Sequence, residues 1–303
     1  MSIYAKVIAD SMSQTGIRLT SMEVCFHRFI LPEVNTHKVL SRNYRSSRAV
    51  PVKKLIEEVR NNPAYPVQWL KNKPGMQATE PMKEWEITLA KKEWLGAAND
   101  AADRAEELAR IGLHKQWANR GLEPYLYVYG IITATEWANF FALRRHSDAQ
   151  PEFKVLADAM WQAREESTPR MLLSNEWHLP YVTDEERLIH RDIAVKLSVA
   201  RCARVSYRTH DGRTPSLEED LALYDRLVGG TPPHASPAEH QACPDFVYGR
   251  ERELVGNENN EPVWRWVTLW NDAPLHGNFT GWVQYRKTLP NECVRDDHQL
   301  VLA

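Results

Sequence analysis

The residues best suited to chemistry lie in one short stretch, Thr36 to Arg48, which is rich in basic, hydroxyl and amide side chains. Its donors are the charged Lys38, Arg42, Arg45 and Arg48 and the neutral Ser41, Asn43 and Ser46. Charged donors suit phosphate oxygens, and short neutral donors suit the edges of heterocycles. The composition therefore favours a binding surface for phosphates and heterocycles. The alternative is a solvated basic turn ahead of a helix that begins near Pro51.

Composition and charge narrow the class of protein. With 303 residues, 43% hydrophobic content and 11 Trp, the chain has ample material for a buried core. The formal net charge of −2 gives no global field for nucleic acid, so any polyanion site must be a local cluster. The longest apolar run, near Tyr125 to Ile132, is too short to span a bilayer. We predict a globular, cytoplasmic protein that is neither exported nor inserted in a membrane.

The cysteines and histidines give little sign of a metal centre. The four cysteines, Cys25, Cys202, Cys243 and Cys293, are far apart, which fits a reduced cytosol and gives no disulfide framework. Near the end of the chain His234, His240 and Cys243 are of zinc-binding types, but their spacing matches no common zinc pattern. We therefore predict no metal site.

Hydrophobic periodicity and capping signals place the elements that must position these residues. Alternation from Met22 to His27 predicts a half-buried strand, and the aromatic run Tyr125 to Ile132 predicts a buried strand or helix turn. The predicted helices, in chain order, are 28–40, 51–60, 80–111, 135–145, 151–166, 184–206 and 216–229. We expect the apolar stripes from Trp85 to Ile111 and from Trp137 to Leu143 to face the core. The Pro-rich segment 61–75 predicts an irregular loop, and Trp69 within it favours a lid.

The stretch that begins at Thr36 resembles the signature of the flavin-dependent thymidylate synthases, R-H-R-x-x-S-x-N-E-x-S-x-R-Y. In this chain it reads T-H-K-V-L-S-R-N-Y-R-S-S-R-A. The matching residues are His37, Ser41, Asn43, Ser46 and Arg48. Lys38 replaces an arginine with conservation of charge, and the departures are Thr36, Tyr44 and Ala49.

Two further blocks are similar to elements of the same family. A family stretch, N-x5-N-x-x-x-x-R followed by A-Q-W-E, is matched by Asn139, Arg144, Ala149, Gln150 and Glu152, with departures at Thr133 and Pro151. The family elements A-R-V-S and H-x-[ST]-P-F-E-H are matched at 203–206 and 234–240, with a departure at Ala238. In the family these two elements precede the basic motif, whereas here they follow it, as in a circularly permuted chain.

The resemblance implies an α+β fold in which long helices pack on a smaller, mainly antiparallel sheet. It implies a single domain over 1–303, with the basic motif and nucleotide-binding helices in 1–175 and the other two elements in 176–303. The implied activity is reductive methylation of dUMP to dTMP, with FAD as hydride carrier, NADPH as reductant and methylenetetrahydrofolate as carbon donor. The family's homotetramers, with active sites between subunits, imply the same assembly here. Small-molecule dUMP and folate are the expected partners, with neither nucleic acid nor membrane.

The resemblance also implies roles for individual residues. The nucleotide would be held by Ser46, Arg48, Arg120 and Arg144, and flavin by His37, Lys38, Asn139, His234 and Ser236. Arg120 is preferred to its neighbour Asn119 because only an arginine can pair with a phosphate. Arg144 would be catalytic, since a fixed guanidinium stabilises the negative charge that makes C5 of a uracil ring nucleophilic. Without the resemblance, we would interpret Arg144 as a cation at a helix C-terminus, where the helix macrodipole favours positive charge.

Departures from the family pattern leave two other activities open. Tyr44 replaces the motif glutamate near the substrate, which leaves open hydroxymethylation of a pyrimidine deoxynucleotide. Thr36, Thr133 and Ala238 depart at or beside flavin-contacting positions, which leaves open a catalytically silent binder of nucleotides or nucleic acid.

Overall fold

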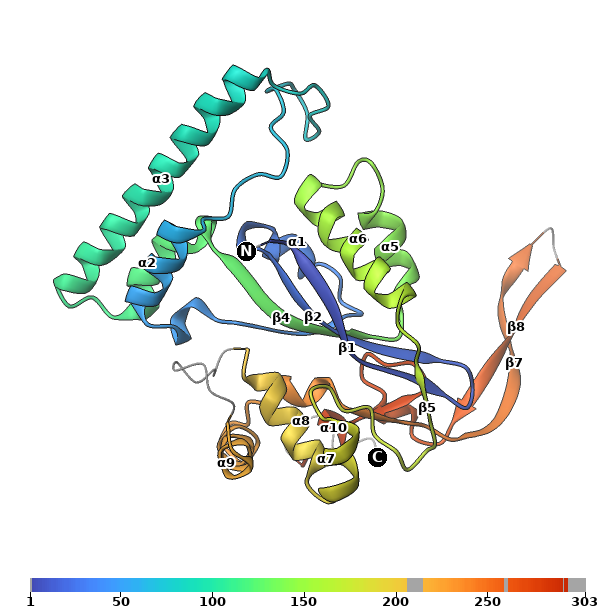
Figure 1. The fold of residues 1–303 in the computed structure, drawn as a ribbon. Helices are drawn as coiled ribbons and strands as arrows, with labels where there is room; N and C mark the ends of the chain where they lie inside the picture. Colours follow the sequence, from blue (N-terminus) through green and yellow to red (C-terminus); the bar gives the residue numbers. More distant parts are fainter. Residues whose placement is uncertain (1, 206–214, 259–260, 291, 294–303) are drawn as a thin grey trace, which may run out of the picture.

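A five-stranded sheet in the order β3-β4-β2-β1-β5 runs through the centre of the computed structural model (Figure 1). Its strands are β1 (Tyr4–Ser13), β2 (Arg18–His27), β3 (Ser41–Tyr44), β4 (Tyr127–Ala134) and β5 (Arg170–Leu172). Neighbouring strands are antiparallel except β1 and β5, which are parallel. The structure describes residues 2–205, 215–258, 261–290 and 292–293. The mainly antiparallel sheet of an α+β fold is confirmed, as is the strand predicted at Met22 to His27.

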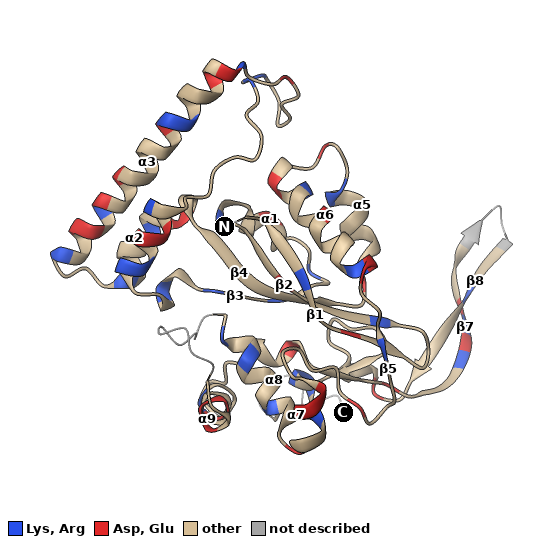
Figure 2. Ribbon diagram, viewed as in Figure 1, with Lys and Arg blue, Asp and Glu red and all other residues tan. Residues whose placement is uncertain are grey.

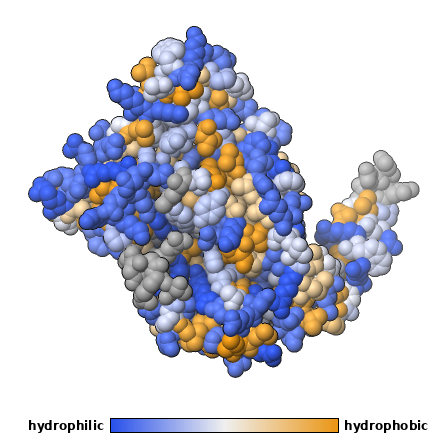
Figure 3. Space-filling view, viewed as in Figure 1, coloured by the Kyte–Doolittle hydropathy of each residue, from blue (hydrophilic) through white to orange (hydrophobic). Residues whose placement is uncertain are grey.

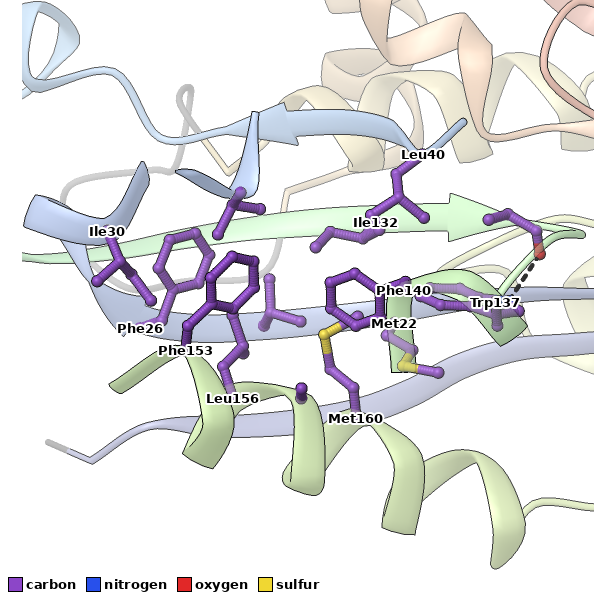
Figure 4. Packing of buried hydrophobic residues seen from close by; sticks show 14 of the residues in the cluster. Met22, Phe26, Ile30, Leu40, Ile132, Trp137, Phe140, Phe153, Leu156 and Met160 are labelled. Carbon is purple, nitrogen blue, oxygen red and sulfur yellow. Dashed lines mark hydrogen bonds between the residues drawn. The ribbon is translucent and has the colours of Figure 1, made fainter. Parts of the chain in front are cut away.

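Helices α5 (Ala138–Arg144) and α6 (Pro151–Glu165) pack on one face of this sheet through the main apolar cluster. Figure 4 shows the buried side chains between the helices and the strands, which include Met22, Phe26, Ile132, Phe140, Phe153, Leu156 and Met160. Trp137 joins the cluster, and its indole Nε1 donates a hydrogen bond of 2.9 Å to the Ala134 carbonyl. Leu143, predicted to face inward, is instead 52% exposed, because it lies on the solvent side of α5.

Helices α2 (Val52–Asn61) and α3 (Glu84–Arg110) form a second layer beside the sheet (Figure 1). The helix predicted at 51–60 is present, but it begins one residue later, with Pro51 as its N-cap. The stripe of α3 is buried only in its C-terminal half, at Ala98, Ala102 and Ala105, whereas Trp85 is 61% exposed. The prediction that the whole stripe faces the core is wrong, because α2 is too short to cover all of α3. Charges of both signs alternate along α3, as on a solvated helix (Figure 2).

Two of the predicted helices are interrupted. The segment 28–40 forms the 3-10 helix η1 (Arg28–Ile30) and the short helix α1 (Leu31–Val34), and the chain then enters β3 as an edge strand on β4. The segment 184–206 forms α7 (Asp184–Ile189) and α8 (Ala194–Ala203). The chain breaks between them because α7 buries no residue whereas α8 is buried along most of its length, so one straight helix could not serve both environments. Ser206 lies outside the described residues.

The rest of the chain packs beside the sheet or projects from it. The remaining elements are η2 (Ser47–Ala49), α4 (Lys115–Ala118), η3 (Asn119–Tyr125), α9 (Leu217–Val228), η4 (Ser236–Glu239), β6 (Ala242–Pro244), β7 (Val247–Glu258), β8 (Glu261–Trp270), η5 (Ala273–Leu275), β9 (Trp282–Gln284) and α10 (Tyr285–Thr288). The helix α9 has the predicted capping box at Ser216 and ends at Gly229. Within the described residues, strands β7 and β8 pair only with each other, and they form a ribbon that extends away from the body (Figure 1).

Gly130 on β4 allows the ring of Tyr44 to lie against the strand. A Cβ at position 130 would come within 2.1 Å of Cδ1 of Tyr44 and 2.8 Å of the Asn43 carbonyl oxygen. We expect Gly130→Ala to lower the free energy of unfolding by roughly 1–3 kcal/mol, because β3 must shift to make room. Denaturant unfolding measures this change.

Gly96→Ala on α3 is the control, since a Cβ there meets nothing within 4 Å. It should stabilise the helix by about 0.5–1 kcal/mol. Equal stability of the two variants would contradict the prediction.

Candidate functional site

A pocket of about 380 Å³ lies where the basic stretch meets the C-terminal part of the chain. Its lining residues are Asn43, Tyr44, Ser46, Arg48, Ala49, His114, Gln116 and His234. We call it the motif pocket. It brings Ser46 and Arg48 of the first block together with His234 of the third, although these blocks are far apart in the sequence. His114 and Gln116, at the start of α4, were not predicted as site residues, and no motif marks them.

Buried amides hold the backbone of the motif pocket in place. The Asn43 side chain donates to the Cys202 carbonyl at 2.9 Å, which ties β3 to the C-terminal end of α8. The fully buried Asn119 donates to the carbonyls of Ser47 at 2.8 Å and Val50 at 3.0 Å. These bonds fix η2, the element that carries Arg48. Asn119 thus supports the pocket through backbone contacts.

Arg120 does not line the motif pocket. Its guanidinium pairs with the Glu123 carboxylate at 2.9 Å, and the same carboxylate accepts from the Ser47 hydroxyl and pairs with Arg28 at 3.2 Å. Burial alone would raise the pKa of Glu123, but the Ser47 hydroxyl and the Arg28 and Arg120 cations outweigh it and lower that pKa. Arg120 therefore has a carboxylate partner within its own subunit, and its role in binding a nucleotide stays a prediction.

His37 and Arg144 meet in a second group of site residues, which joins the first and second blocks. Nε of Arg144 donates to Nε2 of His37 at 2.8 Å, and the guanidinium lies 4.6 Å from the centre of the Phe153 ring. Burial, and then the cations of Arg144 and Arg42, lower the pKa of His37, so the ring is neutral and can accept this bond. Among the described residues no side chain occupies the Nη atoms of Arg144. They are therefore available to a ligand.

The four cations of the basic stretch divide into two pairs. Arg45 forms a bidentate pair with Glu58 at 2.9 and 2.5 Å, and Arg42 donates to the Val34 carbonyl at 3.2 Å. Both therefore have structural partners. Lys38 and Arg48 are exposed, and neither forms an ion pair within the described ranges. These two remain the cations best placed to meet an anionic ligand.

The other predicted flavin contacts lie at the surface. Asn139 is exposed on α5. His234 is exposed beside the motif pocket, and its Nε2 lies 3.3 Å from the Ser236 hydroxyl. Lys38 lines a different pocket, of about 850 Å³, together with Glu136 and residues of the β7–β8 ribbon. The structure thus groups His37 with Arg144, and His234 with Ser236.

A buried chain of hydrogen bonds crosses the sheet, and no motif in the sequence marks it. His178 links Ser11 through Nδ1 and Ser21 through Nε2, both at 2.8 Å. Ser21 lies 2.6 Å from the Thr133 hydroxyl, which in turn lies 2.9 Å from Nδ1 of His240. Thr133, a departure from the family pattern, is fully buried here and serves this chain. Burial lowers the pKa of both His178 and His240 to about 3, so both rings are neutral.

The described residues contain neither a cluster of metal-ligating side chains nor a helix that could span a membrane. Within the described ranges, His, Cys, Asp and Glu side chains form no group of three or more that could hold a metal ion. No helix in the same ranges has both the length and the apolar character needed to cross a membrane.

Comparisons with known proteins place most of the candidate residues in a family region. The family model described as thymidylate synthase complementing protein matches residues 8–170, which include the basic stretch, α5 and α6. No curated protein sequence matches the chain. Crystal structures of a UMP/dUMP methylase, PolB from Streptomyces cacaoi, with 5-Br UMP or 5-Br dUMP bound, are 16% identical to this chain. The match to each structure covers 56% of this chain. It covers 91% and 92% of the two PolB chains, with TM-scores of 0.44 and 0.46, respectively.

Proposed function

The chain belongs to the thymidylate synthase complementing protein family, and from this premise we propose that it is a flavin-dependent thymidylate synthase. The proposed reaction is reductive methylation of dUMP to dTMP with methylenetetrahydrofolate and NADPH. The motif pocket is the observation that carries the proposal, because it joins Ser46 and Arg48 to His234. We also propose that residues 1–303 form one domain, with the nucleotide-binding elements in 1–175 and the A-R-V-S and H-x-S-P-x-E-H elements in 176–303.

The nucleotide would bind through complementary charge. Arg48, exposed on the wall of the motif pocket, supplies a planar cation for the phosphate, and the Ser46 hydroxyl supplies a neutral donor. Arg144 would direct its Nη atoms to the carbonyl oxygen and N3 of the pyrimidine. The bond to His37 and the contact with Phe153 hold the guanidinium in a fixed orientation. A fixed cation stabilises charge on the ring without reorganising during the reaction.

The residues present fit FAD as a cofactor. Its phosphates need cations and its ring needs hydrogen-bond donors, and the exposed Lys38 and the His234–Ser236 pair supply groups of these types. We propose that His37, Lys38, Asn139, His234 and Ser236 hold the cofactor. Bound FAD would supply hydride-transfer chemistry. The protein's own part would be to bind, orient and polarise the substrate.

The separation of the two groups supports a homotetramer. Ser46 and Arg48 lie beyond one end of β3, and His37 and Arg144 lie beyond the other. The strand has four residues, which at about 3.4 Å per residue span roughly 14 Å. The resemblance implies active sites between subunits, and we propose that one site takes these two groups from two subunits. We propose this assembly, in a cytoplasmic protein.

A product assay with an Arg48 variant tests the proposed function. The protein is supplied with FAD, NADPH, methylenetetrahydrofolate and dUMP, and the product is identified by mass. We expect dTMP; a hydroxymethyl product would retain an additional oxygen, and no product would indicate a silent binder. Arg48→Ala should weaken dUMP binding by roughly 10- to 100-fold, because it removes a charge-assisted bond to the phosphate.

Two controls make the Arg48 test specific. Deoxyuridine, which lacks the phosphate, should bind Arg48→Ala and the unaltered protein equally. Arg60→Ala removes an exposed arginine of α2 that pairs with Asp103 and Glu106, and it should leave dUMP affinity unchanged. If Arg48→Ala binds dUMP as tightly as the unaltered protein does, the motif pocket is not the phosphate site.

A further inference from the structure

The larger pocket, of about 850 Å³, lies between the β7–β8 ribbon and the start of the basic stretch. We call it the ribbon pocket. The ribbon contributes Arg265, Trp266, Val267, Thr268 and Trp270. The body contributes Lys38, Val39 and Glu136, and the rest of the lining comes from Ile17 and from residues between His276 and Thr280. The ribbon lies wholly outside residues 8–170, so the family match does not account for it.

The ribbon presents an aromatic and cationic face. Alternate residues of a strand share a face, so Trp264, Trp266, Thr268 and Trp270 lie together on β8. The pairing register places Arg252 opposite Trp266 and Arg250 opposite Thr268 on the same face. The Arg252 guanidinium lies 5.3 Å from the centre of the Trp264 ring. Trp266 is 68% exposed, although a large apolar ring gains nothing from contact with water. Figure 3 shows the ribbon standing clear of the body.

The base of the ribbon is held firmly enough to form a wall. Gly281, at φ +75°, leaves room for the Trp270 ring, since a Cβ there would come within 2.8 Å of its Cη2 atom. The Trp270 ring also packs edge-on against His276, with the ring centres 5.5 Å apart, and His276 is bonded to Asp245 at 2.7 Å. On the facing side, Asn278 donates to the Ser41 hydroxyl of the motif at 3.4 Å. The pocket is thus joined to the basic stretch.

The lining has the chemistry to recognise a planar, charged ligand. Indole faces stack on heteroaromatic rings, and such stacking contributes roughly 1–3 kcal/mol per ring. Lys38, which we also propose as a flavin contact, lines this pocket and offers an ammonium group for an anionic tail, and Glu136 offers a carboxylate for the N–H edge of a heterocycle. Neither side chain forms an ion pair within the part of the chain that is described. Arg265 also lines the pocket, but it is on the opposite face of β8 from Trp266 and pairs with Glu253 at 2.8 Å, so Lys38 is the cation that the proposal uses.

We propose that the ribbon pocket binds a planar heteroaromatic ligand with an anionic tail, stacked on Trp266 beside Lys38. Reduced folates and nicotinamide dinucleotides share this chemistry. The assignment rests on the proposed function, because both are cosubstrates of the proposed reaction. The proposal puts the binding site of one cosubstrate on the β7–β8 ribbon, outside the family region. This site is next to the basic stretch, which carries several of the proposed flavin and nucleotide contacts.

Isothermal titration calorimetry with folinate and, separately, with NADP+ tests the proposal. We expect one of the two to bind the purified protein, and Trp266→Ala to weaken that binding by roughly 5- to 100-fold. The exposure of Trp266 makes its removal safe for folding. Trp85→Ala, at a 61% exposed position on α3, is the matched control and should bind the same ligand as the unaltered protein does.

A parallel titration with dUMP separates this proposal from the proposed function. Trp266→Ala should bind dUMP normally, because Trp266 is not in the motif pocket. If the protein binds neither folinate nor NADP+, or if Trp266→Ala binds them as tightly as the unaltered protein does, the ribbon pocket is not a cosubstrate site. The dUMP and Arg48→Ala experiments would decide the proposed function in either case.

Discussion

Arg144→Ala is expected to lower turnover by roughly two to three orders of magnitude while flavin stays bound. Arg144 is held by the 2.8 Å bond to His37 and by Phe153, with its Nη atoms open to a ligand. Removing a preorganised donor aimed at developing charge typically costs about 10²- to 10³-fold in kcat. The measurement is kcat at saturating dUMP, together with flavin absorbance after desalting. Loss of flavin from the variant would indicate that Arg144 binds the cofactor and not the substrate.

Two further variants separate a catalytic Arg144 from a cation that merely stabilises a helix end. Arg144→Lys keeps the charge but loses the planar fork, so it should recover only part of the activity. Arg145→Ala is the matched control, because this neighbour pairs with Asp158 at 2.8 Å and lies over Trp161. Its removal should affect stability modestly and leave kcat unchanged. If the Arg144 and Arg145 alanine variants lose the same small amount of stability and neither loses activity, the catalytic role is wrong.

The elements whose ends are set by local signals were predictable from the sequence. Pro51 is the N-cap of α2, the capping box at Ser216 begins α9 and Gly229 ends it. The predictions of one continuous helix over 28–40 and over 184–206 were wrong for the same reason. The helical pattern of each segment is local, whereas the break in each segment depends on what its two halves pack against. α1 ends at Val34 and the chain then leads to β3, which pairs with β4, and α8 turns away from the surface helix α7 to become buried.

The candidate site shows the same division between local and tertiary information. The motif residues could be named from the sequence, but which of their cations remain available could not. Arg45 is paired by Glu58, and Arg42 by the backbone of Val34, and both partners are set by the fold. The hydrogen-bond chain from Ser11 to His240 could not be predicted either, because it joins side chains from several separate segments of the sequence. The separation of Ser46 from Arg144 likewise becomes visible only in three dimensions.

Acid is expected to destabilise the fold between about pH 6.5 and pH 3 through His178 and His240. Burial lowers the pKa of both to about 3 in the folded protein, against about 6.5 in the unfolded chain. The unfolded state therefore binds more protons in this window, so stability is full above pH 6.5 and falls as the pH falls. The expected loss by pH 4 is on the order of several kcal/mol. The Glu186 carboxyl, whose pKa Arg201 lowers to about 2, contributes only below about pH 4.5.

Denaturant unfolding at a series of pH values, on His240→Gln and the unaltered protein, isolates this effect. The buried Nε2 of His240 has no hydrogen-bond partner within the described ranges, so a proton there would leave an uncompensated charge. Glutamine can still bond Thr133 but cannot take up that proton. His240→Gln should therefore reduce the pH dependence of stability between pH 6.5 and 4 by roughly half, leaving the part that His178 contributes, even if the variant is less stable at pH 7. His146→Gln, at an exposed position, should keep the full slope. An unchanged slope in His240→Gln would show that this histidine does not carry the acid sensitivity.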